Sequence, residues 1–244
     1  MSITESARAA TSRPSPHLAW PSSGKGDGHL GSPAETATDS DLLRQIGTKL
    51  RFNRNETIFH EGDPAEYAYK LVSGSVRLCK HMADGRRQIA QFLFPGDYFS
   101  FLELEQHSFT AEAVSDVVVT CYPQRQLEAL SKETPALRKK FLAMLSQRVL
   151  DLQEHLVTLG RQTAKERVAS FLVLLSHRVG CEDDNMVDVQ MSRQDIADYL
   201  GLRIETVCRV LSDLKRAGMV DIPNQHQLIL KDVEGLSELA DSVE

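Results

Sequence analysis

The fold of this chain is decided by residues 191–220, MSRQDIADYLGLRIETVCRVLSDLKRAGMV. A first helix is predicted after Ser192, because serine is a preferred helix cap and Asp195, three residues later, completes a capping box. Gly201 is expected to end that helix, since glycine readily adopts the backbone conformation that a tight turn needs. A second helix is predicted to begin at about Arg203.

The spacing of small and apolar residues in this stretch is typical of a helix-turn-helix. Ala197 lets the second helix cross closely, Gly201 forms the turn four residues later, and Val207 follows six residues beyond. An apolar inner face runs along the second helix, formed by Ile204, Val207, Val210, Leu211 and Leu214. The opposite face of that helix is therefore left for a partner.

The outer face of the second helix is predicted to contact double-stranded DNA. In a helix-turn-helix the second helix lies in the major groove, where its N-terminal side chains meet base edges. Glu205 and Arg209 are four residues apart and share one face, so they could read one G·C pair or neighbouring pairs. An ordinary ion pair between them is the alternative, but the surrounding motif favours base reading. The candidate DNA-binding residues are Ser192, Arg203, Glu205, Thr206, Cys208 and Arg209.

The segments on either side of the motif predict a winged helix over residues 162–244. After Gly218 the sequence predicts a strand, a turn at Pro223-Asn224 and a second strand. This wing carries only His226 as a possible cation, so we expect a small contribution to phosphate binding. Before the motif, an amphipathic helix is predicted over residues 163–179 with a capping box at its start, and a short strand over residues 186–191.

Residues 131–161 predict a long helix that mediates dimerisation. Ser131 is expected to cap it, with Pro135 near its first turn, and Phe141 and Met144 are expected to contact the chain's own strands. A narrow apolar seam follows alternating steps of three and four residues: Leu142, Leu145, Val149, Leu152, Leu156 and Leu159. Such a seam favours pairing with a second copy of the same helix, and burial against the β domain is the alternative.

Residues 41–130 predict a short helix over 41–50 followed by an all-β unit. Short runs rich in β-branched and aromatic residues alternate there with Gly, Pro and Asp turns, which is typical of a sandwich or barrel. Residues 1–40 are rich in Ser, Pro, Gly, Ala and Thr, so a flexible tail is expected.

Composition bounds the class of protein. The 244 residues carry a net charge of −6, with 41% hydrophobic and 25% charged residues, which is ordinary for a globular protein. No apolar run approaches the ~20 residues of a membrane span, and the N-terminus lacks an apolar core, so we expect a cytoplasmic protein. Four scattered cysteines indicate reduced thiols.

No enzyme motif is recognised, and the acidic residues 182–184 are expected to form a solvated loop without a metal, so no catalytic residues and no metal site are predicted.

Over about residues 41–240 the chain resembles the CRP–FNR superfamily of bacterial transcription regulators, specifically its FNR/FixK branch. The 191–220 motif carries this resemblance, and ADGRRQIAQFLFPGDYFSF at 83–101 adds the strand and Pro-Gly-Asp layout of the family's sensor domain. The resemblance implies an α+β fold, with a cyclic-nucleotide-binding-like β-roll over 41–130, a long dimerisation helix and a C-terminal winged helix-turn-helix. It also implies an activator that binds a palindrome as a homodimer and works with RNA polymerase, as regulators of low-oxygen respiration and nitrogen fixation genes do.

The recognition helix resembles the pattern E-x-x-S-R of FNR-type proteins. Glu205 and Arg209 match it and imply a TTGA-like half-site, whereas Cys208 replaces the serine and resembles the FixK subgroup. Positive charge from Arg203 and Arg209 would favour the reactive thiolate form of Cys208. Its oxidation would place a new anion or a bulky group against the DNA, which makes Cys208 a candidate redox off-switch. A cysteine that only makes a weak contact in place of serine is the alternative.

The sensor domain departs from its ligand-binding relatives. Relatives that bind cyclic nucleotides have Gly-Glu and later Arg-Ser, whereas this chain has Gly96-Asp97 and His107-Ser108, so a cyclic phosphate would lack its arginine. Iron–sulfur relatives cluster cysteines near the N-terminus, but none precedes Cys79 here. We therefore expect no cofactor. The alternative is a regulator that needs an effector or a gas-binding haem in the β-roll, although the candidate haem ligands His60, His81 and His107 are expected to be surface or turn residues.

Overall fold

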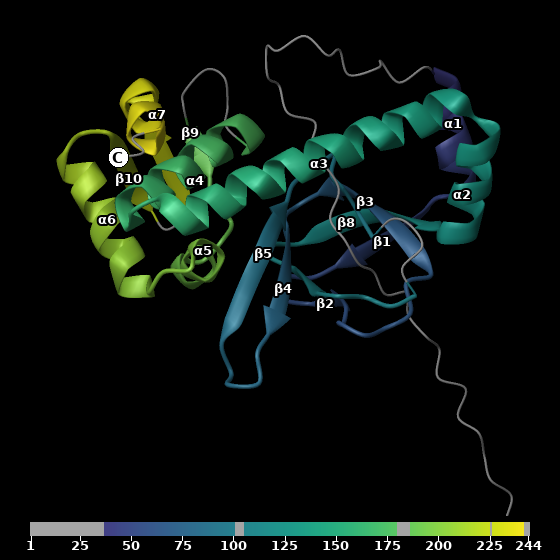
Figure 1. The fold of residues 1–244 in the computed structure, drawn as a ribbon, viewed down its shortest axis with the longest axis horizontal. Coiled ribbons are helices and arrows are strands. Elements are labelled where there is room, and N and C mark those ends of the chain that lie inside the picture. The colour runs from purple at the N-terminus through teal and green to yellow at the C-terminus, as the bar shows by residue number, and fades with distance from the viewer. Residues whose placement is uncertain (1–36, 101–104, 180–185, 225, 242–244) are drawn as a thin grey trace, which may run out of the picture.

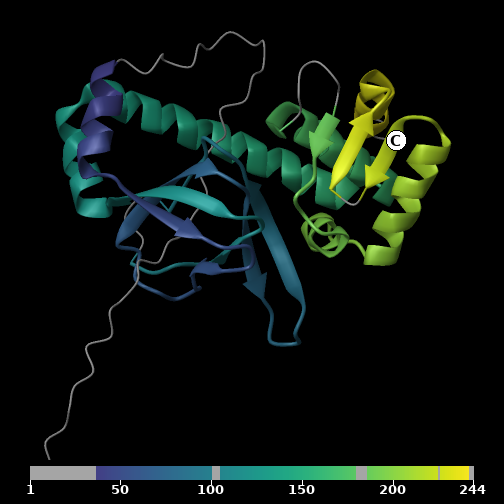
Figure 2. The same cartoon turned by 180° about the vertical axis from the view of Figure 1, so that it is seen from behind.

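The computed structural model describes residues 37–100, 105–179, 186–224 and 226–241. Long helix α3 runs along the molecule, from helices α1 and α2 beside the N-terminal β-roll to the C-terminal helices and the small sheet (Figures 1 and 2). No helix in the described part of the chain is long and apolar enough to cross a membrane.

The β-roll consists of two four-stranded antiparallel sheets, as the alternation of strands and turns predicts. Their strand orders are β1-β8-β3-β6 and β2-β7-β4-β5. Apolar side chains from both sheets share one core, which includes Tyr69, Leu78 and Phe99. The strands are β1 (Thr48–Phe52), β2 (Thr57–Phe59), β3 (Tyr67–Ser73), β4 (Val76–His81), β5 (Arg87–Leu93), β6 (Tyr98–Phe99), β7 (Thr110–Ala113) and β8 (Val117–Pro123).

The first helix lies earlier in the chain than predicted. Helix α1 spans Ala37–Ile46, so it begins inside the range predicted as a tail, and the rest of that tail lies outside the described residues. The predicted helix over 41–50 is wrong at its end, because β1 begins at Thr48. Thr48 and its neighbours pair with β8, and this pairing takes the chain out of the helix.

Two helices replace the single helix predicted from residue 131. Helix α2 spans Gln124–Glu133 and α3 spans Pro135–Arg161. Ser131 is not a cap: it lies inside α2, where its hydroxyl donates to the Glu128 carbonyl at 2.8 Å. A residue before proline is disfavoured in helical geometry, and Thr134 is accordingly extended, which separates the two helices. Pro135 begins α3, as its position in the sequence predicts.

The C-terminal unit is a helix-turn-helix with a three-stranded sheet, in the order β10-β11-β9. Both predicted capping boxes are present, at Thr163 with Glu166 and at Ser192 with Asp195. Helix α7 was not predicted; it begins where Asp232 accepts the Gly235 amide at 2.8 Å, and it packs against α4. The elements are α4 (Ala164–Val179), β9 (Met186–Asp188), α5 (Arg193–Leu200), α6 (Ile204–Arg216), β10 (Val220–Asn224), β11 (Gln227–Leu230) and α7 (Val233–Asp241).

One apolar core joins the β-roll to the C-terminal unit. It contains Cys79, Ile89 and Phe92 of the roll together with core residues of α4, α5 and α6. The Phe92 ring lies 5.2 Å from the ring of Tyr199, which belongs to α5. The hairpin of β4 and β5 therefore packs directly on the first helix of the helix-turn-helix (Figures 1 and 2).

Candidate nucleic-acid interface

The turn between α5 and α6 has the geometry that its sequence predicts. Ser192 Oγ accepts the Asp195 amide at 3.0 Å, and the Asp195 carboxylate accepts the Ser192 amide at 3.0 Å. Gly201 ends α5 in the left-handed conformation with φ 62°, and α6 follows from Ile204. A side chain other than glycine would be strained at that φ, so Gly201 fixes the angle between the two helices.

Helix α6 separates its predicted inner and outer faces cleanly. Val207 and Leu214 are fully buried and Ile204 is half-buried. Among the described residues, no ion pair or hydrogen bond joins the side chains of Glu205 and Arg209, so the alternative of a simple surface ion pair has no support. The outer face is exposed at Arg203, Glu205, Cys208 and Arg209 and half-exposed at Thr206.

Arg193 is a cation near this face that was not predicted from the sequence. It is the first residue of α5 and is half-buried. Burial lowers the pKa of Arg193, while a negative charge on the neighbouring Cys208 side chain would act in the opposite direction. Arg193 and Cys208 lie on different helices, and only the crossing of α5 and α6 brings them together. A positive group thus lies near the candidate redox residue.

The wing is the hairpin of β10 and β11, as predicted. The His226 amide donates to the Asn224 side chain at 2.9 Å, which shapes the turn. Lys215 and Lys231 also lie at the base of the wing, where both approach Asp221, at 2.9 Å and 3.9 Å. Lys215 and Lys231 therefore add positive charge beside the wing, so the prediction that it carries only His226 as a possible cation is wrong, although the Asp221 carboxylate offsets part of their charge.

The predicted dimer seam on α3 is largely uncovered by the described residues. Leu142 is 59% exposed and Leu156 is 68% exposed. The alternative, burial of the seam against the β-roll, is not observed: Leu137 and Phe141 are the α3 residues buried in the cluster with the roll, and Met144 is partly buried beside them, so the predicted contacts of Phe141 and Met144 are confirmed. The rest of the seam comprises Val149 and Leu152, both exposed, and Leu145 and Leu159, both half-buried.

Asp97, in the Gly96-Asp97 pair of the β-roll, makes its contacts within the chain. Asp97 is buried, accepts the Phe94 amide at 2.8 Å and forms an ion pair with Arg178 of α4. Burial raises the pKa of Asp97 to about 6, although the charge of Arg178 opposes the shift. Asp97 thus connects the roll to the C-terminal unit.

Of the candidate haem ligands, His60 and His81 are exposed, but His107 is buried against Phe59, so the surface prediction for His107 is wrong.

A cavity of about 210 Å³ lies where α3, α4 and α5 meet β5. Arg148 and His155 of α3 line it, together with Arg178 and Tyr199. The His155 ring stacks on Tyr199 with centroids 4.3 Å apart. Burial lowers the pKa of His155 to about 4, with help from the charges of Arg148 and Arg167. The contact between α3 and α5 is therefore made by a neutral histidine.

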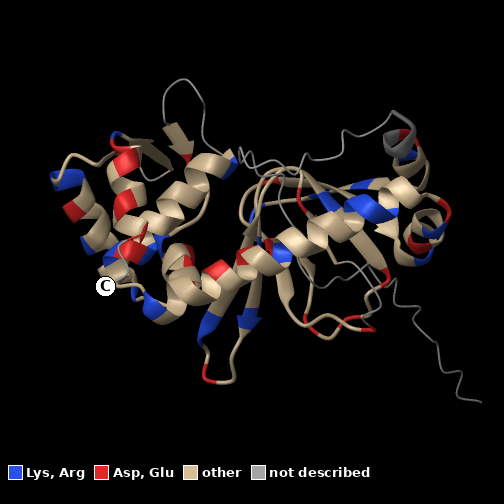
Figure 3. Ribbon diagram, turned by 45° about the horizontal axis from the view of Figure 1, so that its top comes forward, with Lys and Arg blue, Asp and Glu red and all other residues tan. Residues whose placement is uncertain are grey.

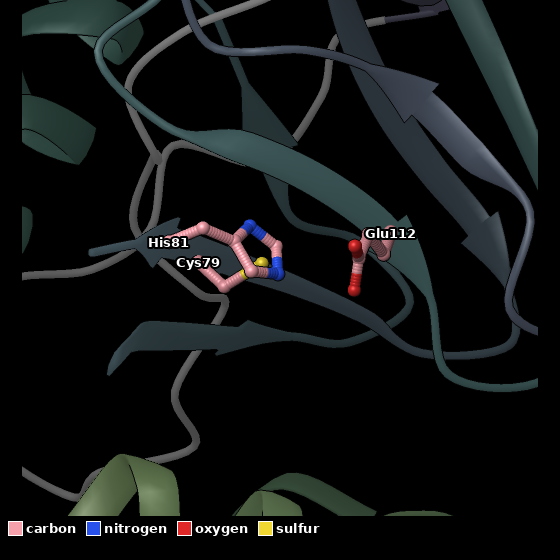
Figure 4. A group of neighbouring side chains, drawn as sticks. All are labelled: Cys79, His81 and Glu112. Carbon is pink, nitrogen blue, oxygen red and sulfur yellow. The ribbon is translucent and has the colours of Figure 1, made fainter. Parts of the chain in front are cut away.

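Cys79, His81 and Glu112 come close enough to be considered as metal ligands (Figure 4). Cys79 and His81 lie on β4, and Glu112 lies on β7. The Glu112 carboxylate already accepts the Arg77 Nε at 2.8 Å. Burial raises the pKa of Cys79 to about 12, and a metal would need its thiolate. These residues therefore do not make a good metal site.

Comparison with known proteins agrees with this geometry. The model of the cyclic nucleotide-binding domain matches residues 49–134, and the model of the Crp-like helix-turn-helix domain matches residues 166–239. The nitrogen fixation regulation protein FixK of Azorhizobium caulinodans is 41% identical over 208 residues, covering 84% of this chain and 84% of that protein. The transcriptional activator protein FnrL of Cereibacter sphaeroides is 29% identical over 204 residues, covering 81% of this chain and 82% of that protein.

Among solved structures, FixK2 from Bradyrhizobium japonicum superposes with a TM-score of 0.77 at 36% identity. The match covers 82% of this chain and 100% of that one. These relatives match the β-roll as well as the helix-turn-helix, so the resemblance extends over both parts of the chain. The chain belongs to the CRP–FNR family of transcription regulators, in the branch of the FixK and FNR proteins.

Proposed function

We propose that this protein is a transcription activator that binds a palindrome of TTGA-type half-sites in double-stranded DNA as a homodimer. The observation that carries the proposal is the outer face of α6, where Glu205 and Arg209 are exposed and unpaired with each other among the described residues. Arginine donates two hydrogen bonds to guanine, and glutamate accepts from the cytosine amino group. Both partners of a G·C pair can therefore be read from one helix.

The remaining candidate residues have supporting roles. Arg203 at the start of α6 is exposed, Thr206 lies one turn before Arg209, and Ser192 caps α5. Helix starts and hydroxyl groups bind phosphate oxygens, which fix the register of the protein on the duplex. Arg203, Thr206 and Ser192 would hold α6 in place while Glu205 and Arg209 select the sequence.

Dimerisation is proposed through the seam of α3. An exposed apolar stripe on a helix of a regulator is a candidate interface, because burying it removes apolar surface from water. A two-fold dimer presents two copies of α6 to two half-sites about one helical turn apart. Residues 131–161 would then form the dimerisation part, between a sensor-like part at 41–130 and a DNA-binding part at 162–244.

The physiological setting is proposed from the relatives. Proteins named as FixK regulate nitrogen fixation, and FnrL is named as a transcriptional activator. We infer that this protein acts on comparable genes in the cytoplasm, recruits RNA polymerase and has no enzymatic role. The buried ion pair of Asp97 with Arg178 argues against a nucleotide phosphate or ribose at that position.

Direct redox control is proposed at Cys208. Its side chain is exposed on the groove-facing side of α6, whereas Cys79 and Cys121 are buried. An exposed thiol near Arg193 and Arg209 is open to peroxide, and a sulfinate or sulfonate there would repel DNA phosphates.

The test is DNA binding by the purified protein without added ligand, with and without reductant. The proposal expects specific binding to a palindrome of two TTGA half-sites, retained with reductant and lost after oxidation. A requirement for an added effector, or an absorbance band from a bound haem, would instead support the sensor alternative. Equal binding to the palindrome and to random DNA would contradict the proposed function itself.

A further inference from the structure

Two arginines of the β4–β5 hairpin reach carboxylates on α5. Arg87 places one terminal nitrogen 2.5 Å from an Asp195 oxygen, and its Nε donates to Asp198 at 2.8 Å. Arg77 lies 3.3 Å from Asp195 and also binds Glu112. All five side chains are at most 19% exposed. Figure 3 shows basic residues on both strands of this hairpin.

We propose that Arg77 and Arg87 are positioning residues for DNA reading, because they fix the direction of α5, and through it that of α6, relative to the β-roll. The inference rests on the proposed dimeric DNA binding. The arginines are not expected to contact DNA themselves. They set where the two recognition helices of a dimer lie with respect to each other.

Asp195 of the helix-turn-helix contacts both arginines of the roll. Its carboxylate completes the capping box of α5 with Ser192 and also receives both guanidinium groups. Burial raises the pKa of Asp195, but hydrogen bonds from Ser192 and the charges of Arg77 and Arg87 outweigh it and hold the pKa below its usual value. The carboxylate is thus kept ionised where the first helix begins.

The link from Asp195 to α6 is short and stiff. Helix α5 is eight residues long and ends at Gly201, whose left-handed conformation sets the angle to α6. Apolar contacts lie beside the ion pairs, with Phe92 of β5 against Tyr199 of α5. Arginine–carboxylate contacts are directional, and a buried charge left without its partner is costly. The hairpin therefore holds the helix-turn-helix, α5 and α6, in one orientation relative to the β-roll.

This orientation has a measurable consequence in a dimer. Two half-sites must lie about one helical turn apart, so both recognition helices have to be held at that separation. If the helix-turn-helix were not fixed relative to the β-roll, the dimer would tolerate half-sites at other separations. The ion pairs should therefore determine the preference for half-site spacing more than the affinity for a single half-site.

The experiment compares Arg87→Met with a matched control, Arg86→Met. Arg86 is the neighbouring residue on the same hairpin, is 76% exposed and pairs only with Asp84 among the described residues. Full-length proteins are titrated with three duplexes: the palindrome, the same palindrome with two base pairs added between half-sites, and a single half-site. The wild type and Arg86→Met are expected to prefer the unaltered palindrome over the lengthened one by about tenfold or more.

Arg87→Met is expected to bind the unaltered palindrome several-fold more weakly, to lose most of its preference over the lengthened duplex, and to keep its single-site affinity. Asp198→Asn, which leaves the capping box intact, should shift the same ratio in the same direction and serves if Arg87→Met does not fold. A spacing preference unchanged in both variants, or equal losses on all three duplexes, would overturn the proposal. A wild type without preference for the palindrome would instead refute the proposed function.

Discussion

Arg209 is proposed to read guanine in the recognised half-site. Its replacement by alanine removes the two donors expected to meet guanine, so the specific complex should lose about 1–3 kcal/mol and tolerate other base pairs at that position. Titration of the variant with the palindrome and with random duplexes measures both effects. Equal losses on the two kinds of DNA would mean that Arg209 only contacts phosphate.

Cys208 is the residue at which oxidation should act. After peroxide treatment the wild-type protein is expected to lose operator binding while it stays folded and dimeric, because the added charge or bulk lies at the DNA surface. Cys208→Ser should keep its binding under the same treatment. If both proteins lose binding to the same extent, another cysteine or general damage is responsible and the switch is excluded.

At the residue scale, local chemistry could be predicted and proximity in space could not. Ser192, Asp195 and Gly201 carry signals that depend on neighbours within a few residues, and each has the predicted role in the turn. Arg193 was missed because its nearness to Cys208 depends on how two helices cross. His107 was misplaced because nothing in its neighbouring sequence indicates that it packs against Phe59.

The seam of helix α3 is the element expected to hold the dimer. Aspartate at both Leu145 and Leu152 would bury charge in the interface, which costs several kcal/mol unless the subunits separate. Sedimentation should then report a monomer. As a control, aspartate at both Ala143 and Gln147 adds the same charge at exposed positions off the seam and should leave the dimer intact. A seam variant that stays dimeric would refute this interface.

His155 of α3 should make stability depend on pH. Its folded pKa of about 4 lies below the ordinary value of 6.5, so the stability it contributes is present above pH 6.5 and is lost as the pH falls towards 4. His155→Phe keeps a ring against Tyr199 but cannot titrate. Allowing for solvent screening, the unfolding free energy of the wild type should fall by about 1–2 kcal/mol relative to the variant between pH 7 and 4.

Denaturant unfolding of both proteins at one fixed concentration measures this difference, since dimerisation also affects stability. A difference between wild type and His155→Phe that stays constant with pH would show that His155 titrates normally in the folded protein.

At the element scale, hydrophobic period and turn residues predicted most helices and strands. The errors lie where a tertiary contact or a single backbone restriction decides the boundary. Pairing of Thr48 with β8 shortens the first helix, and the extended Thr134 before Pro135 divides the long helix in two. Helix α7 was missed because it is short and contains Gly235.

At the scale of the whole molecule, the order of β-roll, long helix and winged helix-turn-helix could be predicted from the sequence. The contacts between the β-roll and the winged helix-turn-helix could not. Arg87 and Asp195 are 108 residues apart in sequence, and an ion pair over that distance has no local pattern. The same holds for Asp97 and Arg178. Ion pairs of this kind, which also include Arg77 with Asp195 and Arg87 with Asp198, join the roll to the C-terminal unit, so both parts are expected to respond together when either is altered.

In the proposed complex, two copies of α6 in one dimer each read a G·C pair of a TTGA half-site. The measurement is the affinity of the reduced wild-type protein for the palindrome and for duplexes in which that G·C pair is replaced by A·T in one half-site or in both. We expect two chains per palindrome and a loss of about 1–3 kcal/mol of binding free energy for each replaced pair, roughly additive. Affinity that does not change with either replacement would contradict the proposal.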